Sequence, residues 1–87
     1  MEQTITIQNK KGLHARAAAK FVKLVESHDA EIAVIKGDVS VGGQSIMGLL
    51  MLGASIGSEI TIKSSGTQGE EALSALVSLI NRRFDEE

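Results

Sequence analysis

The chain has no cysteine, no tryptophan and no tyrosine, and phenylalanine, present twice, is its only aromatic residue. Without cysteine the protein forms no disulfide bond, no cysteine-ligated zinc site and no thiol nucleophile. Proteins usually bind single-stranded nucleic acid by stacking bases on aromatic side chains, which are scarce here. The formal net charge of −2 also argues against binding to a phosphate backbone. We therefore expect no nucleic-acid partner.

Long hydrophobic runs are missing as well. The densest apolar stretch, residues 46–54, is interrupted by two glycines and is far shorter than the ~20 residues that span a bilayer. The first residues, MEQTITIQ, alternate polar and apolar side chains, unlike the continuous apolar core of a signal peptide. We expect a cytoplasmic protein that does not bind membranes. At 87 residues it has room for one hydrophobic core, so residues 1–87 are expected to form a single domain.

The hydrophobic periodicity changes several times along the chain. Alternating or short apolar segments predict strands at residues 4–8, 31–36, 38–41 and 58–64. A spacing of three and four residues predicts helices from Ala15 to about residues 27–29, from Ser45 to Gly53, and after Thr67. The order is βαββαβα. Strands with one polar face indicate an α+β fold with an antiparallel sheet whose helices cover one side.

The last predicted helix carries signals at both ends. Thr67 and Glu70 have the spacing of a capping box, which predicts the start of the helix. Arg82 and Arg83 fall in its predicted last turn, where cations suit the helix dipole, and Phe84 extends its apolar stripe.

A histidine and an arginine stand at the start of the first predicted helix, in the segment GLHAR (residues 12–16). Basic side chains are unexpected there, because the start of a helix carries partial positive charge and favours anions. If the helix begins at Ala15, His14 is its N-cap residue. The amides of Ala15, Arg16 and Ala17 then have no intrahelical acceptor. Such amides bind phosphate, and the guanidinium of Arg16 matches phosphate oxygens.

Imidazole is partly neutral near pH 7, so His14 adds a nucleophilic nitrogen to these groups. A nucleophile, anion-binding amides and a cation within three residues suit a covalent phosphohistidine, which needs no metal ligand. Histidine is also a permissible N-cap, and an exposed histidine followed by arginine occurs in helices with no such role. The residues alone leave both interpretations open. His28 lies 14 residues further on without accompanying ligands, so we expect no metal site.

The segment GGQSIMGLLMLG (residues 42–53) contains a second candidate site. Ser45 is a candidate N-cap, and the short helix after it is more apolar than one buried face requires. Exposed apolar residues that include methionine suit a surface that meets several partners. We expect Ile46, Met47 and Leu50 to contribute to partner docking.

GLHARAAAKFV, followed by SIMGLLMLG 31 residues beyond the histidine, resembles HPr, the histidine-containing phosphocarrier of the phosphoenolpyruvate-dependent sugar phosphotransferase system. The resemblance covers nearly the whole chain. It implies an open-faced sandwich with a four-stranded antiparallel sheet in the order 1-4-2-3. It also implies that His14 accepts a phosphoryl group on Nδ1 from phosphorylated enzyme I and passes it to an enzyme IIA domain. Such a carrier is not itself an enzyme and needs no cofactor.

By matching position, the resemblance makes Arg16 the counter-ion of the phosphate and Ser45 a regulatory serine, which a dedicated kinase phosphorylates in some relatives. We expect the carrier to be a monomer. One departure is Ala17, where the family usually has proline; alanine keeps an N–H donor but constrains the first turn less. Nitrogen-branch carriers share the motif, so they remain an alternative. Another is a regulatory binding module that acts through the Ser45 helix without carrying phosphate.

Overall fold

The structure is a computed structural model that describes residues 1–86. Four strands and three helices follow one another in the predicted order, βαββαβα. The elements are β1 (Glu2–Thr6), α1 (Ala15–Glu26), β2 (Glu31–Lys36), β3 (Val39–Gly42), α2 (Ile46–Met51), β4 (Glu59–Ser65) and α3 (Gly69–Asn81). They are followed by a short turn at Arg83–Asp85, called the terminal turn below. Within the described residues, no helix is long and apolar enough to cross a membrane.

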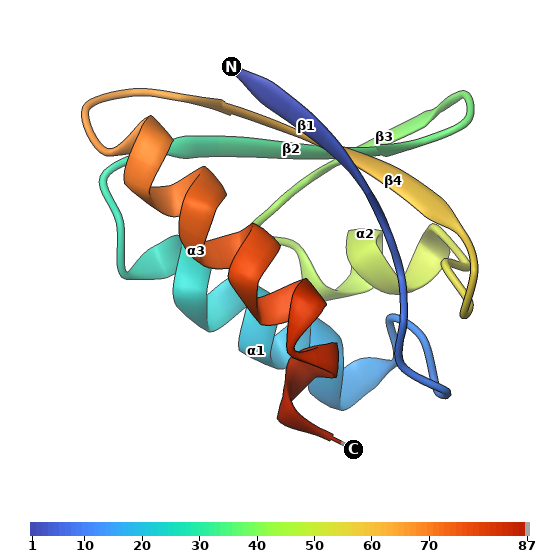
Figure 1. The fold of residues 1–87 in the computed structure, drawn as a ribbon. Coiled ribbons are helices and arrows are strands. Elements are labelled where there is room, and N and C mark those ends of the chain that lie inside the picture. Colours follow the sequence, from blue (N-terminus) through green and yellow to red (C-terminus); the bar gives the residue numbers. More distant parts are fainter. Residues whose placement is uncertain (87) are drawn as a thin grey trace.

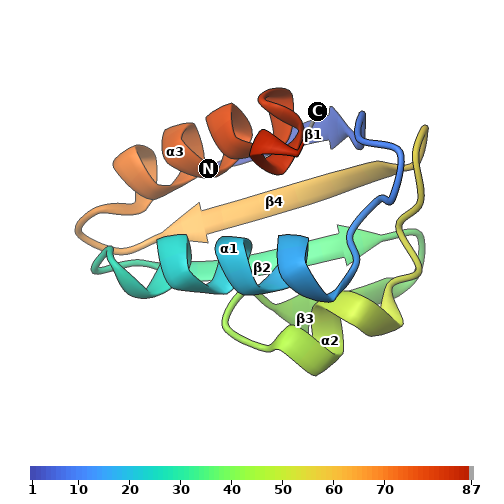
Figure 2. The ribbon, with the colours of Figure 1, turned by 90° about the horizontal axis from the view of Figure 1, so that it is seen from below.

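The strands form one antiparallel sheet in the order β1-β4-β2-β3, which confirms the expected fold. Its register places Ile5 of β1 opposite Ile60 of β4, and Val34 of β2 opposite Ile62 of β4. These apolar side chains are buried because they point to the face that the helices cover. Figures 1 and 2 show α1 and α3 side by side on that face.

The hydrophobic core lies between the sheet and the helices. Helix α1 buries one apolar face against the sheet, with Phe21 fully enclosed. The start of α3 differs from its prediction, because the helix begins at Gly69 and its N-cap residue, Gln68, makes no side-chain cap bond. The prediction of a capping box at Thr67 and Glu70 is therefore wrong.

The segment before α3 is held by long-range hydrogen bonds instead of a capping box. The backbone N–H of Gln68 donates to the carbonyl of Asp29 (2.8 Å). The N–H of Asp29 in turn donates to the side-chain oxygen of Gln68 (2.6 Å). These bonds join the start of α3 to the turn between α1 and β2. The start of the helix is thus set by tertiary contacts that a local sequence pattern does not contain.

The chain after α3 also differs from its prediction. Arg82 is the C-cap residue and Arg83 lies outside the helix. Arg83, Phe84 and Asp85 all have left-handed backbone, with φ of 58°, 55° and 60°. Left-handed conformation costs roughly 1–2 kcal/mol per residue for side chains with a Cβ atom. The terminal turn is held by the burial of Phe84, which is fully enclosed in the core.

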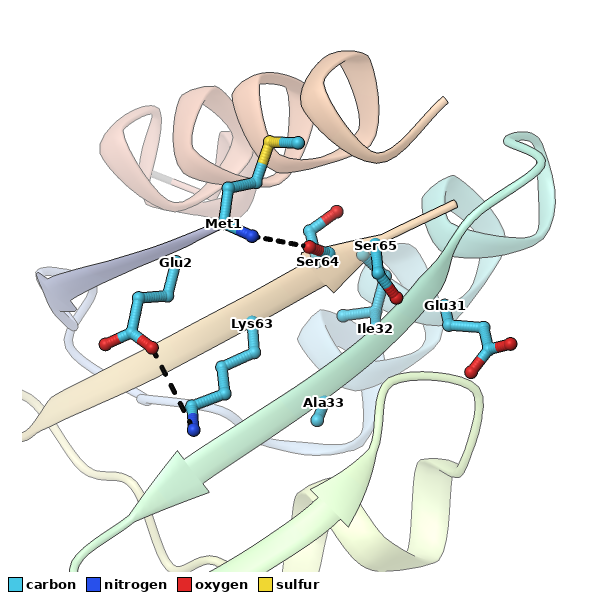
Figure 3. A pocket seen from close by; sticks show the side chains of 8 residues that line it. All are labelled: Met1, Glu2, Glu31, Ile32, Ala33, Lys63, Ser64 and Ser65. Atoms are coloured by element: carbon cyan, nitrogen blue, oxygen red, sulfur yellow. Dashed lines mark hydrogen bonds and ion pairs between the residues drawn. The ribbon is translucent and has the colours of Figure 1, made fainter. Parts of the chain in front are cut away.

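The N-terminus is fastened to the far end of β4. The terminal amino group of Met1 donates to the carbonyl of Ser64 (2.9 Å), and Glu2 lies 3.9 Å from the ammonium of Lys63 (Figure 3). A shallow hollow of about 420 Å³ lies beside these residues. No residue of the segments GLHAR or GGQSIMGLLMLG lines this hollow.

Candidate phosphate site at the start of helix α1

A tight turn between β1 and α1 positions His14. Gly12 has a φ of +66°, and a Cβ atom there would lie 2.6 Å from the carbonyl oxygen of Ala54. Only glycine fits this backbone without a shift of its neighbours. The next amide, that of Leu13, donates to the same Ala54 oxygen (2.8 Å). The turn is therefore fixed against the chain after α2, and the residue that follows it, His14, has a defined place.

His14 is the N-cap residue of α1, as expected, and its side chain makes no cap bond to the helix amides. Ala15 and Arg16 are exposed, so their N–H groups lie at an accessible helix end. Ala17, in contrast, has no exposed surface. Its amide is closed to a ligand in this conformation, so the set of candidate phosphate-binding amides narrows to Ala15 and Arg16.

A carboxylate from the other end of the chain contacts His14. The Nε2 atom of His14 forms a hydrogen bond with Oε2 of Glu86, 72 residues away in the sequence. The other carboxylate oxygen of Glu86 accepts from the side-chain amide of Asn9 (2.9 Å). Sequence reasoning missed both partners. Glu86 carries no local signal, and Asn9 looks like an ordinary turn residue.

The contact is partly shielded from water, because 23% of the His14 side chain and 13% of the Glu86 side chain are exposed. Burial raises the pKa of the Glu86 carboxyl group. The hydrogen bonds from Asn9 and His14 lower that pKa more, together with the positive charge of Arg16 and that of His14 when its ring is protonated. The net result is a pKa below the ordinary value of 4.5, so Glu86 is a carboxylate at neutral pH.

A basic cleft of about 280 Å³ lies next to Glu86. Its lining residues are Lys10, Lys11, Arg16, Lys20, Asp85 and Glu86. The ammonium of Lys20 donates to the carbonyl of Phe84 (2.6 Å), which ties the terminal turn to α1. Residues 1–86 hold no cluster of three or more histidine, aspartate or glutamate side chains placed to bind a metal ion. Four of the six lining residues are cations and two are acids, so the net charge of the cleft favours an anion.

The second candidate site begins at Ser45, the N-cap residue of α2. Its hydroxyl oxygen accepts from the amide of Gly48 (2.9 Å), as the sequence predicted. Ile46 and Met47 are exposed, by 40% and 70%, whereas Leu50 is partly buried against the core. Met51, which sequence reasoning did not single out, is 77% exposed. Helix α2 therefore presents a methionine-rich apolar surface, with Met51 rather than Leu50 at its exposed end.

The sequence and the fold match known phosphocarriers. The family model described as "PTS HPr component phosphorylation site" matches residues 1–82. The four-stranded sheet with its helices on one face is thus the fold of a class of phosphotransferase-system proteins. The chain belongs to the HPr family of phosphocarrier proteins.

Individual relatives resemble the chain over nearly its full length. It is 51% identical over 83 residues to the phosphocarrier protein HPr of Pseudomonas aeruginosa, covering 94% of this chain and 92% of that protein. It is 42% identical over 86 residues to the phosphocarrier protein NPr of Shewanella violacea, with 99% and 94% covered. The crystal structure of HPr-C-His from Thermoanaerobacter tengcongensis has a TM-score of 0.95, 45% identity, and 100% and 98% coverage. An HPr dimer from the same organism has a TM-score of 0.78, 44% identity, and 97% coverage of both chains.

Proposed function

We propose that His14 is the phosphoryl acceptor of this carrier, taking the group from phosphorylated enzyme I and passing it to enzyme IIA domains. The observation that carries the proposal is the position of His14 at the start of α1, beside the exposed residues Ala15 and Arg16. Amides at a helix start and a guanidinium together stabilise the charge of a transferring phosphoryl group.

The transfer conserves atoms and electrons in both directions. The lone pair of His14 Nδ1 forms a bond to phosphorus while the bond from phosphorus to the donor breaks, and its electron pair stays on the donor. In onward transfer the Nδ1–P bond breaks, its electron pair returns to Nδ1, and the acceptor's lone pair forms the new bond. Positioning and charge neutralisation do most of the work in such a transfer. Arg16 and the amides of Ala15 and Arg16 supply both.

Partner docking is assigned to α2 in the same proposal. Ile46 and Met47 give it an exposed apolar surface, to which Met51 adds. Phosphorylation of Ser45 by a serine kinase would add a charge of about −1.5 to −2 at pH 7 beside that surface. A charge at this place remains compatible with the fold because it faces the start of α2, and it weakens docking because it must be desolvated there. Ser45 is accordingly proposed as a regulatory site.

The relatives include both HPr and NPr proteins, so the proposal covers enzyme I and enzyme IIA as classes and assigns no single branch. The carrier is proposed to act as a monomer, although a related HPr is described as a dimer. Sedimentation at the concentrations used for transfer tests that assignment.

The decisive experiment incubates the chain with phosphoenolpyruvate and enzyme I and follows its mass. The expected result is the addition of one phosphoryl group that is labile in acid and stable in alkali. His14→Ala should abolish the addition and leave the circular dichroism spectrum unchanged. Labelling of the His14→Ala variant would overturn the assignment. A wild-type chain that stays unlabelled but binds partners through α2 would instead support a regulatory binding module.

A further inference from the structure

We propose that Glu86 and Asn9 are positioning residues, which hold His14 as the tautomer with its proton on Nε2 and so keep the Nδ1 lone pair available for phosphorus. This deepens the function proposed above and rests on it for its purpose. The geometry behind it stands by itself. It consists of one short chain of hydrogen bonds that runs from a buried amide, through a carboxylate, to the imidazole.

The direction of each of these hydrogen bonds follows from which groups can donate and which can only accept. The side-chain amide of Asn9 contacts two oxygens, the carbonyl of Gly12 (2.9 Å) and Oε1 of Glu86 (2.9 Å). Both are acceptors, so the amide nitrogen must face them and donate. Asn9 is fully buried, and its own oxygen has no hydrogen-bond partner among the described residues. If the amide were reversed, its oxygen would face the Gly12 carbonyl and Oε1 of Glu86, which are both acceptors.

Oε1 of Glu86 therefore accepts a hydrogen bond from the Asn9 amide, and Oε2 of Glu86 is hydrogen-bonded to Nε2 of His14. A carboxylate can only accept, so Nε2 must carry the proton that makes this bond. In neutral imidazole one nitrogen is a donor and the other an acceptor. With the proton held on Nε2, Nδ1 keeps its lone pair. That nitrogen makes no cap bond to the helix, so nothing at the helix start competes for the pair.

Glu86 also suits the phosphorylated state. When Nδ1 bonds to phosphorus and Nε2 keeps its proton, the ring carries a positive charge. The carboxylate of Glu86 compensates that charge on the side of the ring away from the phosphoryl group. No proton has to enter or leave the ring in either direction of transfer. Glu86 and Asn9 thus set the protonation of the nucleophile without touching phosphorus.

An amide at position 86 provides a sharp test. A glutamine side chain has one acceptor and one donor in place of two acceptors. The hydrogen bond to the Gly12 carbonyl keeps the Asn9 amide nitrogen in place as a donor, so it must donate to the side-chain oxygen of the glutamine. The glutamine NH₂ group then faces Nε2 of His14 and donates to it. The proton of the neutral ring moves to Nδ1, and the nucleophilic lone pair is lost.

The tautomer of His14 can be read from its ring ¹⁵N chemical shifts by NMR, at about pH 8.5, above the usual titration range of imidazole. We expect the Nε2–H form in wild type, mainly the Nδ1–H form in Glu86→Gln, and a mixture in Glu86→Ala. Glu86→Asp, which keeps two acceptors on a shorter side chain, should restore part of the Nε2–H form. Asp85→Asn is the matched control. It removes the same charge one residue earlier from a carboxylate that pairs with Arg82, and should leave the tautomer unchanged.

Phosphoryl transfer gives a second, separate readout. Because only molecules with a free Nδ1 lone pair react, the initial rate of Glu86→Gln should fall about tenfold if about a tenth of the molecules keep the Nε2–H form. Glu86→Asp should recover part of that loss. An unchanged tautomer in both Glu86→Gln and Glu86→Ala would overturn the inference. If wild type shows the expected tautomers but accepts no phosphoryl group, the proposed function fails while the role of Glu86 in setting the tautomer stands.

Discussion

Phe84 offers the most direct test of the terminal turn, because one side chain holds three left-handed residues in place. Its side chain is fully buried, although it follows the last helix by three residues. Replacing a buried phenylalanine with alanine ordinarily costs about 3–5 kcal/mol of unfolding free energy. We expect Phe84→Ala to lose less than that.

The reduction follows from backbone strain. Arg83, Phe84 and Asp85 have φ between 55° and 60°, at a cost of roughly 1–2 kcal/mol each. Without the aromatic ring, the terminal turn has too little burial to keep this conformation and unwinds, which releases the strain. The loss is then limited to the net free energy that holds the turn in wild type. We expect a loss of at most about 2 kcal/mol, or a fall in Tm of no more than roughly 8–16 °C for a domain of this size.

Urea unfolding followed by far-UV circular dichroism measures this loss. Two further variants make the test specific. A chain that ends at Asn81 lacks the terminal turn altogether, and its stability should match that of Phe84→Ala. Phe84→Leu keeps most of the buried volume and should cost less than about 1.5 kcal/mol. A loss of about 4 kcal/mol or more in Phe84→Ala, well beyond that of the shortened chain, would show that the turn stays folded and refute the reasoning from strain.

Four further substitutions test other parts of the structure. The pKa of Glu86 lies below its ordinary value of 4.5, so its carboxylate stabilises the fold above that pH. This stabilisation is lost as the pH falls through the folded-state pKa. Glu86→Gln should therefore flatten the acid side of a plot of unfolding free energy against pH. Ser45→Ala should cost about 0.5–2 kcal/mol of unfolding free energy through loss of the N-cap. Ser45→Asp should keep the Tm and slow phosphate acceptance at limiting carrier concentration, and an equal rate at every concentration would remove α2 as the docking surface. Ala17→Pro should keep transfer and raise stability by about 0.4–1 kcal/mol, whereas a lower Tm would mean that the ring does not fit this buried position.

Local patterns predicted the elements that bury one regular face. The alternation around Ile60 and Ile62 and the helical spacing of Phe21 each describe a side chain that points into the same core. Ser45 was predicted as an N-cap because a cap is a contact between residues three apart, here with Gly48. His14 was placed at the helix start for the same local reason. Periods and caps are properties of neighbouring residues, so one sequence is enough to reveal them.

The contacts that the sequence did not predict join distant residues. Glu86 and His14 are 72 positions apart, and the terminal turn, which bends the chain after α3, lies between the helix and Glu86. Left-handed backbone is usually indicated by glycine, or less often by asparagine or aspartate, and Asp85 is the one residue of these types in the turn. The periodic pattern of α3 also gives no reason to end the helix before Arg82 and Arg83. Packing of Phe84 overrides local preference there, and packing is a property of the whole fold.

The unusual charge pattern at the start of α1 has a physical explanation in these distant contacts. A common helix start carries an acidic residue in its first turn, which reaches back to the N–H of the N-cap residue. In this chain the N–H of His14 already donates to the carbonyl of Gly12 (3.0 Å), and α1 has no acidic residue in its first turn. An acid there would compete with a phosphoryl group for the amides of Ala15 and Arg16. Glu86 supplies the carboxylate from the end of the chain, on Nε2 of the ring, where it leaves those amides to a ligand.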